Sequence, residues 1–172
     1  MNRIFFDERN APQAIAFTGH RILTPEERAE ADLRLYEFVS QAANLGTREF
    51  ICGGALGFDT AAELAVLKLK REYPDVRLRL FLPCREHYKY WSQADAAVFE
   101  EILRLADSAE YANEKYFRGC MQMRDRAMVD ASEMLAAWLR ADEMTGGTVY
   151  TVRYALKHGV RVVNLIGDIE NE

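Results

Sequence analysis

Cysteine and proline are scarce in this chain, which has 3 cysteines and 4 prolines among its 172 residues. Cys52, Cys84 and Cys120 are odd in number and far apart, and they form neither a CxxC pair nor a His/Cys spacing typical of a metal site. This scarcity favours reduced thiols in a cytosolic protein over a disulfide framework. We therefore expect no metal site and no structural disulfide.

Long hydrophobic runs are also missing. No stretch reaches the length of a transmembrane helix, and residues 1–7 lack the apolar run of a signal peptide. Positive charge is not in excess either, because 22 Lys and Arg residues stand against 27 Asp and Glu residues and leave a net charge of −5. This balance disfavours nucleic acid and anionic membranes as partners, although a local basic patch is compatible with it. We expect a cytoplasmic protein without a membrane partner.

What the chain does have is the composition of an ordinary globular protein, with 49% hydrophobic and 28% charged residues. A chain of this length buries a substantial core without disulfides or metals. No repeat, low-complexity tract or linker interrupts the sequence. We therefore expect residues 1–172 to form one domain.

Short apolar segments alternate with helical patterns along the whole chain. The expected strands are 13–18, 49–52, 76–82, 109–112, 134–139 and 160–165, and the expected helices are 25–44, 60–73, 93–106, 117–131 and 146–158. The first helix should start with a capping box, because Thr24 is followed three residues later by Glu27. Pro74 is expected to end the second helix and Pro83 to end the third strand.

This alternation predicts an α/β fold. The segment MLAAW at 134–138 is continuously apolar, as expected of a strand that is covered on both faces. The arrangement that follows is a single Rossmann-like three-layer domain, with a mostly parallel sheet, helices on both faces and right-handed crossovers. In such folds ligands bind beyond the carboxyl ends of the strands.

Glycines and polar side chains gather where three of the expected strands end. They are Gly19, His20 and Arg21 after the first strand, Gly53, Gly54, Gly57 and Asp59 after the second, and Gly146, Gly147 and Thr148 after the fifth. Two of these loops lead into helices, whose N-termini present unpaired N–H groups and a partial positive charge. We expect phosphate or ribose cradles at Gly53–Gly54 and at Gly146–Gly147. Glycine also serves tight strand-to-helix turns, and that alternative stays open.

The side chains around these loops have expected roles. Arg21 would hold a phosphate through its forked guanidinium, and Thr148 would add a hydroxyl donor. Asp59 would accept hydrogen bonds from ribose hydroxyls or cap the helix expected at residue 60. His20 is interpreted as a structural histidine rather than as a general base.

The helix expected at 117–131 has a structural and a functional interpretation. In the first, Arg126 and Asp130 form an i,i+4 ion pair on a solvated surface. In the second, Arg124 points at the ligand rim and Asp130 ties down a glycine loop.

An aromatic and basic run, HYKYW, occupies residues 87–91. These rings could stack on a nucleic-acid or nucleotide base, or they could pack within their own loop or form a subunit contact. For Tyr88 and Tyr90 we favour these structural alternatives, packing or a subunit contact, and we leave Trp91 open.

Four motifs taken together resemble those of a known family. They are residues 17–21 (FTGHR), 53–59 (GGALGFD), Arg124 with 128–130 (MVD), and 146–148 (GGT) with 154–155 (YA). Their order and spacing are similar to those of the YpsA-like family of the SLOG superfamily, which also contains DprA (Smf) and the LOG nucleotide hydrolases. The resemblance covers residues 13–165. It implies a Rossmann-like fold and a bound nucleotide such as ADP-ribose, NAD or a nucleoside phosphate.

The resemblance and the strand-end rule together predict the ligand-binding residues. They are Gly19, His20, Arg21, Gly53, Gly54, Gly57, Asp59, Arg124, Asp130, Gly146, Gly147 and Thr148. No catalytic residue is assigned, and no cofactor is expected apart from the bound nucleotide. A homo-oligomer is expected by analogy with other small Rossmann-like domains.

Three functions are compatible with these residues. The first is a nucleotide-binding sensor or regulatory module, because no convincing acid, base or nucleophile accompanies the glycine loops. The second is hydrolysis of an N-glycosidic bond as in LOG proteins, with Asp59, Asp130 or Glu63 in place of the LOG glutamate, which is missing from residues 146–153. The third is DprA-like binding of single-stranded DNA, which the net negative charge disfavours. We expect the first.

Overall fold

The computed structural model describes residues 4–6 and 11–166. Most of the segment 1–7, on which the expected absence of a signal peptide rests, lies outside these residues. The elements are, in chain order, β1 (Ala14–Gly19), α1 (Pro25–Asn44), β2 (Glu49–Cys52), α2 (Phe58–Leu69), β3 (Arg77–Cys84), α3 (Gln93–Leu105), β4 (Ser108–Asn113), α4 (Cys120–Asp130), β5 (Met134–Trp138), α5 (Gly147–Lys157) and β6 (Arg161–Asn164).

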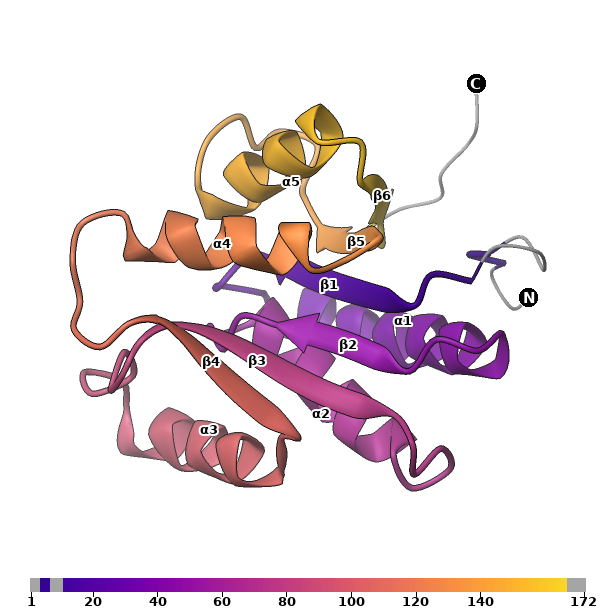
Figure 1. Cartoon of the computed structure of the whole chain (residues 1–172), viewed down its shortest axis with the longest axis horizontal. Coiled ribbons are helices and arrows are strands. Elements are labelled where there is room, and N and C mark those ends of the chain that lie inside the picture. The colour runs from indigo at the N-terminus through magenta and orange to yellow at the C-terminus, as the bar shows by residue number, and fades with distance from the viewer. Residues whose placement is uncertain (1–3, 7–10, 167–172) are drawn as a thin grey trace.

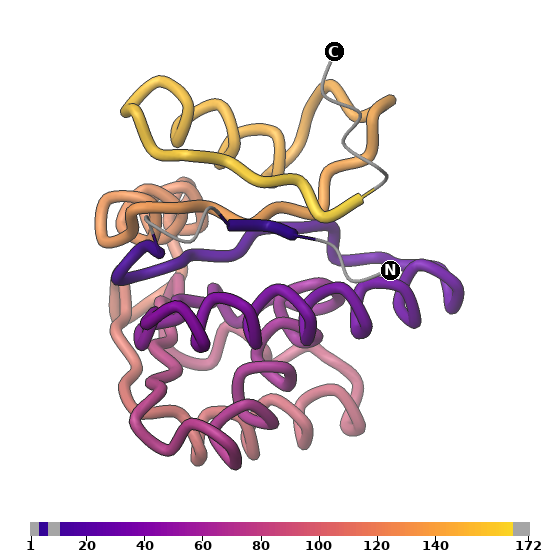
Figure 2. Tube along the Cα trace, turned by 90° about the vertical axis from the view of Figure 1, so that its right-hand side faces the viewer, coloured from indigo at the N-terminus to yellow at the C-terminus, as the bar shows by residue number. Residues whose placement is uncertain are grey.

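These strands form one fully parallel sheet. The strand order is β4-β3-β2-β1-β5-β6, and every neighbouring pair is parallel. Helices α1, α2 and α3 lie on one face of the sheet, and α4 and α5 cover the other (Figure 1). Figure 2, turned by 90°, shows α1 and α5 on opposite sides of the sheet. The expected three-layer α/β fold is confirmed.

The core consists of two apolar layers, one on each face of the sheet. Because successive side chains of a strand point to opposite faces, Ile15 and Phe17 of β1 face α1 to α3, whereas Ala14 and Ala16 face α4 and α5. The layer under α1 to α3 holds most of the large buried side chains. On the other face, the small alanines of β1 let α4 and α5 pack close to the sheet.

The first helix starts as the sequence predicts. Thr24 Oγ1 accepts a hydrogen bond from the Glu27 N–H at 3.1 Å, and Glu27 Oε2 accepts one from the Thr24 N–H at 2.8 Å. This capping box satisfies two N–H groups that would otherwise lack a partner, and an N-cap of this kind contributes about 1 kcal/mol.

Pro83 does not end the third strand, so that prediction is wrong. β3 continues to Cys84, whose partner in β4 is Asn113. The pairing with β2 stops earlier, at the pair formed by Cys52 and Leu80. One side of β3 is therefore free at residue 83, and a proline is tolerated where a strand has lost a neighbour.

Two helices start two or more residues away from the expected position, and in both cases a glycine is the N-cap. α2 starts at Phe58, because Gly57 takes a positive φ of 76° at the N-cap. α4 starts at Cys120, because Gly119 takes a φ of 100° at its N-cap. Asp59 therefore lies inside the first turn of α2 and is not its N-cap.

Strand β1 is the point at which the sheet changes its direction of growth. From β1 the chain adds β2, β3 and β4 on one side, and after α4 it returns to place β5 and β6 on the other. The carboxyl ends of β1 and β5 therefore border a crevice of the kind in which α/β folds bind ligands. No described helix is long and apolar enough to cross a membrane.

Candidate ligand site at the carboxyl rim of the sheet

A pocket of ≈ 190 Å³ opens at this crevice, and we call it the rim pocket. It lies between the end of β1, the loop before α2, the first turns of α4 and the loop before α5. The predicted ligand-binding residues that line it are Gly19, His20, Arg21, Asp59, Arg124, Gly146, Gly147 and Thr148. The fold thus gathers residues from three separate loops and from α4 around one hollow.

Four predicted ligand-binding residues do not line the rim pocket, namely Gly53, Gly54, Gly57 and Asp130. The first three belong to the loop between β2 and α2, and Asp130 is the last residue of α4. Their contacts, given below, are with other parts of the protein.

The loop before α5 has the features expected of an anion cradle. Gly146 has a φ of 105°, and a Cβ at Gly146 or Gly147 would meet no atom of residues 4–6 or 11–166 within 4 Å. No hydrogen bond between described residues uses the N–H groups of Gly147, Thr148 or Val149. Since the first turn of a helix carries a partial positive charge, these free donors favour a phosphate or carboxylate.

The glycines before α2 serve internal packing instead. A Cβ at Gly53 would lie 2.8 Å from Arg124 Nη1, and a Cβ at Gly54 would lie 2.4 Å from Leu82 Cδ2. At Gly57 the nearest atom is the backbone oxygen of Arg21, at 2.3 Å. The bare backbone here makes room for the protein itself.

The polar groups of that loop are also occupied. The Gly54 N–H donates to Glu63 Oε1 at 3.0 Å, and the Ala55 N–H donates to Asp59 Oδ2 at 3.2 Å. The Gly54 carbonyl contacts His87 Nε2 at 2.8 Å. The N–H groups of Gly54 and Ala55 therefore already have carboxylate acceptors, which disfavours the phosphate cradle expected at Gly53–Gly54.

A buried group of charges lies beneath the loop. Arg124 donates from Nη1 to the Gly53 carbonyl and from Nε to Asp125 Oδ1, the latter at 2.6 Å. Burial raises the pKa of Asp59 to about 6, although the Arg124 charge and the N–H of Ala55 act to lower it.

Glu63 lies deeper than Asp59 and is fully buried. Burial, together with the nearby Asp59 carboxylate, raises the pKa of Glu63 well above its usual range. Its Oε2 has no hydrogen-bond partner among the described residues, which is consistent with a protonated, neutral carboxyl group. Glu63 thus supports the loop from inside and does not face the rim pocket.

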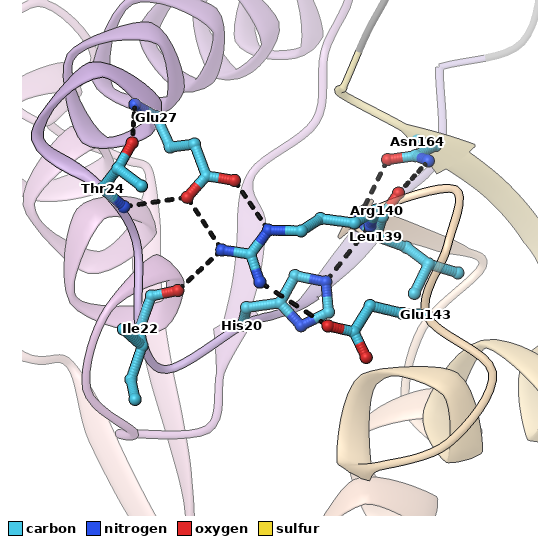
Figure 3. A network of polar contacts seen from close by, with 8 residues as sticks. All are labelled: His20, Ile22, Thr24, Glu27, Leu139, Arg140, Glu143 and Asn164. Carbon is cyan, nitrogen blue, oxygen red and sulfur yellow. Dashed lines mark hydrogen bonds and ion pairs between the residues drawn. The ribbon is translucent and has the colours of Figure 1, made fainter.

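His20 is held in place by a network that joins the loop after β1 to the loop after β5 (Figure 3). His20 Nε2 accepts a hydrogen bond from the Arg140 N–H at 3.1 Å. Burial and the nearby Arg140 charge lower the pKa of His20, so the ring is neutral and its proton is on Nδ1. The structural role expected for His20 is therefore present, with one N–H left to donate.

Arg140 is the residue of this network that sequence reasoning missed. Its guanidinium binds both carboxylate oxygens of Glu27 at 2.7 and 2.8 Å and donates to the Ile22 carbonyl at 2.8 Å. The hydrogen bond from Arg140 and the one from the Thr24 N–H lower the pKa of Glu27 to about 2. Arg140 comes two residues after β5, so the strand-end rule applied to that loop would have found it.

Arg21 lies at the rim pocket, whereas Asp130 contacts another helix. Arg21 is exposed at the mouth of the rim pocket, and its guanidinium contacts Met121 Sδ at 3.8 Å. Asp130 accepts a hydrogen bond from the Tyr154 hydroxyl at 2.9 Å, and Arg126 donates to the Tyr150 hydroxyl at 2.8 Å. Both α4 residues therefore bind α5, and the expected roles of Asp130, in an ion pair with Arg126 or on a glycine loop, are wrong.

The aromatic side chains of residues 87–91 have different environments in the structure. The rings of His87, Tyr88 and Trp91 lie 5.0, 4.9 and 5.6 Å from the ring of Phe99 on α3. Packing is thus confirmed for Tyr88 and is also the role of Trp91. Tyr90 is 88% exposed and does not pack within the loop, so the subunit contact is the structural alternative that stays a prediction for this residue.

A known family model matches most of the chain. The profile described as the YspA SLOG family, named YpsA, covers residues 33–163. The chain belongs to the YpsA family of SLOG proteins.

Curated relatives of this YpsA-family chain come from bacteria. A UPF0398 protein of Bacillus cereus strain B4264 is 28% identical over 116 residues, which are 66% of this chain and 62% of that protein. The chain thus matches less than two thirds of that relative's length. The uncharacterized SPbeta prophage-derived protein YoqJ of Bacillus subtilis strain 168 is 31% identical over 120 residues, or 63% of this chain and 69% of YoqJ.

Two solved structures share the fold. DNA processing protein A from Helicobacter pylori, described as having a single-stranded DNA binding mode, superimposes with a TM-score of 0.63 at 21% identity, covering 94% of this chain and 69% of that one. The protein TM1055 superimposes with a TM-score of 0.57 at 16% identity, covering 87% and 72%. The SLOG fold predicted from the four motifs is confirmed.

Proposed function

We propose that this YpsA-family protein binds a nucleotide-type ligand in the rim pocket and acts as a sensor or regulatory module. The observation that carries this proposal is the N-terminus of α5, whose N–H groups at Gly147, Thr148 and Val149 are without partners among the described residues and whose glycines leave open space. A ligand phosphate would accept hydrogen bonds from these groups. The proposal keeps the cytoplasmic location expected from the sequence.

The other residues of the rim pocket complement a nucleotide. Arg21 would approach a second phosphate or the outer oxygens of the first. Neutral His20 would donate from Nδ1 to a phosphate or ribose oxygen, and Asp59 would accept from a ribose hydroxyl. Arg124 is already bound to Gly53 and Asp125, so its remaining N–H groups would act as a fixed positive floor.

The replacement of Gly147 by valine tests this proposal. The added side chain would occupy the open space over the α5 N–H groups, while the backbone at residue 147 does not need a positive φ. We expect the affinity for AMP or ADP-ribose, measured by titration calorimetry, to fall at least about 10-fold without a large change in thermal midpoint.

Ala127→Val is the matched control. Ala127 is exposed on α4 and does not line the rim pocket, so a valine there should leave the affinity unchanged. If AMP, ADP-ribose and NAD neither release heat nor raise the thermal midpoint of the unaltered protein, the proposed function is wrong.

A second candidate function, hydrolysis of an N-glycosidic bond, is favoured by one observation. Asp59 lines the rim pocket, and burial brings its pKa to about 6, where a carboxyl group can donate a proton to a departing base. Of the three carboxyl groups considered from the sequence, Glu63 and Asp130 do not line the pocket. Asp59 is therefore the candidate acid.

Chromatography for released base tests the hydrolase. If the protein hydrolyses AMP or NAD, we expect adenine or nicotinamide to accumulate and Asp59→Asn to reduce the rate at least about 100-fold. His20→Gln, which changes a different polar residue of the same pocket, would reduce the rate less. Absence of released base at high protein concentration would exclude this function and leave the sensor proposal intact.

A further inference from the structure

A second and larger hollow lies beside the rim pocket, and we call it the outer groove. Its volume is ≈ 870 Å³, and it lies between the loop after β3 and the segment that joins β4 to α4. Its lining includes Lys89, Tyr90, Lys115, Tyr116 and Met121. None of the roles assigned above uses it.

The outer groove is connected to the rim pocket. Between them lies a narrow hollow of ≈ 60 Å³, which we call the neck. The neck shares Arg21 and Arg124 with the rim pocket and His87 with the outer groove, and Met121 lines all three hollows. The three hollows therefore follow one another along the carboxyl rim of the sheet.

The side chains of the outer groove suit an aromatic base. Tyr90 is 88% exposed and Tyr116 is 69% exposed, although burial of a tyrosine ring is energetically favourable. The Lys89 ammonium lies 5.0 Å from the centroid of the Tyr90 ring. Met121 adds a polarisable thioether, which packs well against flat rings.

Charge in the groove is available for a ligand. Arg85 is paired with Glu114 at 2.8 Å. The ammonium groups of Lys89 and Lys115 form no ion pair with any described residue. The groove therefore combines exposed rings with two lysines that have no ion pair among the described residues, beside one acidic side chain outside the Arg85–Glu114 pair, Glu86.

The loop that carries Tyr90 is anchored from below. His87 Nε2 lies 2.8 Å from the Gly54 carbonyl, and its ring packs against Phe99. Glu86, one residue earlier, has a φ of 53°, the only positive φ of a non-glycine residue in the described part of the chain. An L residue adopts this conformation at a cost, so the loop is held in a fixed shape while Tyr90 stays exposed.

We propose that the outer groove binds the second base of a dinucleotide whose first nucleotide lies in the rim pocket. This inference rests on the function proposed above and names its ligand class. The neck is much smaller than the hollows at its two ends, so a ligand that fills both has two bulky ends and a slim link. Two nucleosides joined through phosphates have this shape, and the exposed Arg21 at the neck is placed to bind the link.

The test compares AMP with diadenosine diphosphate, a symmetric probe that offers the same base at both ends. Titration calorimetry of the unaltered protein should give an affinity for diadenosine diphosphate at least about 10-fold higher than for AMP. The double variant Tyr90→Ala/Tyr116→Ala should lower the affinity for diadenosine diphosphate about 10-fold to 100-fold and leave that for AMP unchanged. Both tyrosines are exposed, so the fold should tolerate the change.

Leu156→Ala is the control, because Leu156 is 62% exposed on α5 and lies outside all three hollows. Equal affinities for the two probes, or a double variant that binds diadenosine diphosphate normally, would overturn this inference while AMP binding upholds the proposed function. If neither probe binds, this inference fails, and the proposed function fails with it when ADP-ribose and NAD do not bind either. A short oligo(dT) that binds more tightly than diadenosine diphosphate and loses affinity in the double variant would overturn the inference in favour of single-stranded nucleic acid.

Discussion

Replacing Gly57 with alanine is expected to lower the free energy of unfolding by about 3–5 kcal/mol. Gly57 has a φ of 76°, and a Cβ there would lie 2.3 Å from the Arg21 backbone oxygen and 2.6 Å from that of His20. Backbone atoms cannot turn aside as a flexible side chain can. The His20 oxygen also accepts the hydrogen bond of the Phe58 N–H at 3.1 Å, so the clash would separate the loop after β1 from the start of α2.

Urea unfolding of Gly57→Ala and of Gly46→Ala separates the cost of the steric clash from the conformational cost of a positive φ. Gly46 has a φ of 109°, but a Cβ there would meet no atom of the described part of the chain within 4 Å. Its replacement therefore carries only the conformational cost of about 1–2 kcal/mol. A loss at Gly57 no larger than the loss at Gly46 would contradict the close packing of the two loops.

Element order could be read from the sequence because its signals are local. The continuously apolar segment at Met134–Trp138 is a strand under any packing that covers both faces. The capping box of Thr24 and Glu27 needs only residues three apart. Pro83 misled because its effect depends on whether β2 still pairs with β3 at that point, which is a property of the assembled sheet.

The candidate site was only partly predictable, because glycine does not reveal which atom approaches it. The sequence allowed a ligand at both glycine loops, and the structure separates them. At Gly53 the approaching group is Arg124, which lies 71 positions further along the chain. At Gly147 the approach stays open. Such contacts follow from the register of β1, β2 and β5 and not from local spacing.

The two glycine loops therefore have different roles at the carboxyl rim of the sheet. The loop before α2 is a support, because its backbone is bound by Asp59, Glu63 and Arg124. The loop before α5 is the part that we propose contacts the ligand, because it lines the rim pocket and no described residue uses its N–H donors. Substitutions in the first loop should change stability, and substitutions in the second should change ligand affinity.

Arg124→Met tests whether the loop before α2 depends on the buried charges beneath it. We expect this variant to lower the free energy of unfolding by about 3–5 kcal/mol near pH 8 and by less near pH 5. The Arg124 side chain is 7% exposed and is bound to Asp125 Oδ1 at 2.6 Å and to the Gly53 carbonyl. Its removal leaves the carboxylates of Asp59 and Asp125 without their buried cation. Breaking a buried ion pair from one side is costly because the remaining charge stays uncompensated.

The pH dependence follows from Asp59. Its folded pKa of about 6 lies above the usual 3.8, so the native state holds a proton that the unfolded state has lost between these values. The contribution of Asp59 to stability is therefore complete below 3.8 and declines as the pH rises through about 6. Without the Arg124 charge, the pKa of Asp59 rises further and the decline continues to higher pH.

Urea unfolding at about pH 5 and about pH 8, with Arg126→Met as the control, measures this difference. Arg126 lies on the same helix but on the surface, where it binds the Tyr150 hydroxyl, so its replacement should change stability little and equally at both pH values. An Arg124→Met penalty that is the same at both pH values would contradict the coupling to Asp59. A penalty that grows with pH would establish that the glycine loop before α2 rests on a buried carboxylate whose proton depends on Arg124.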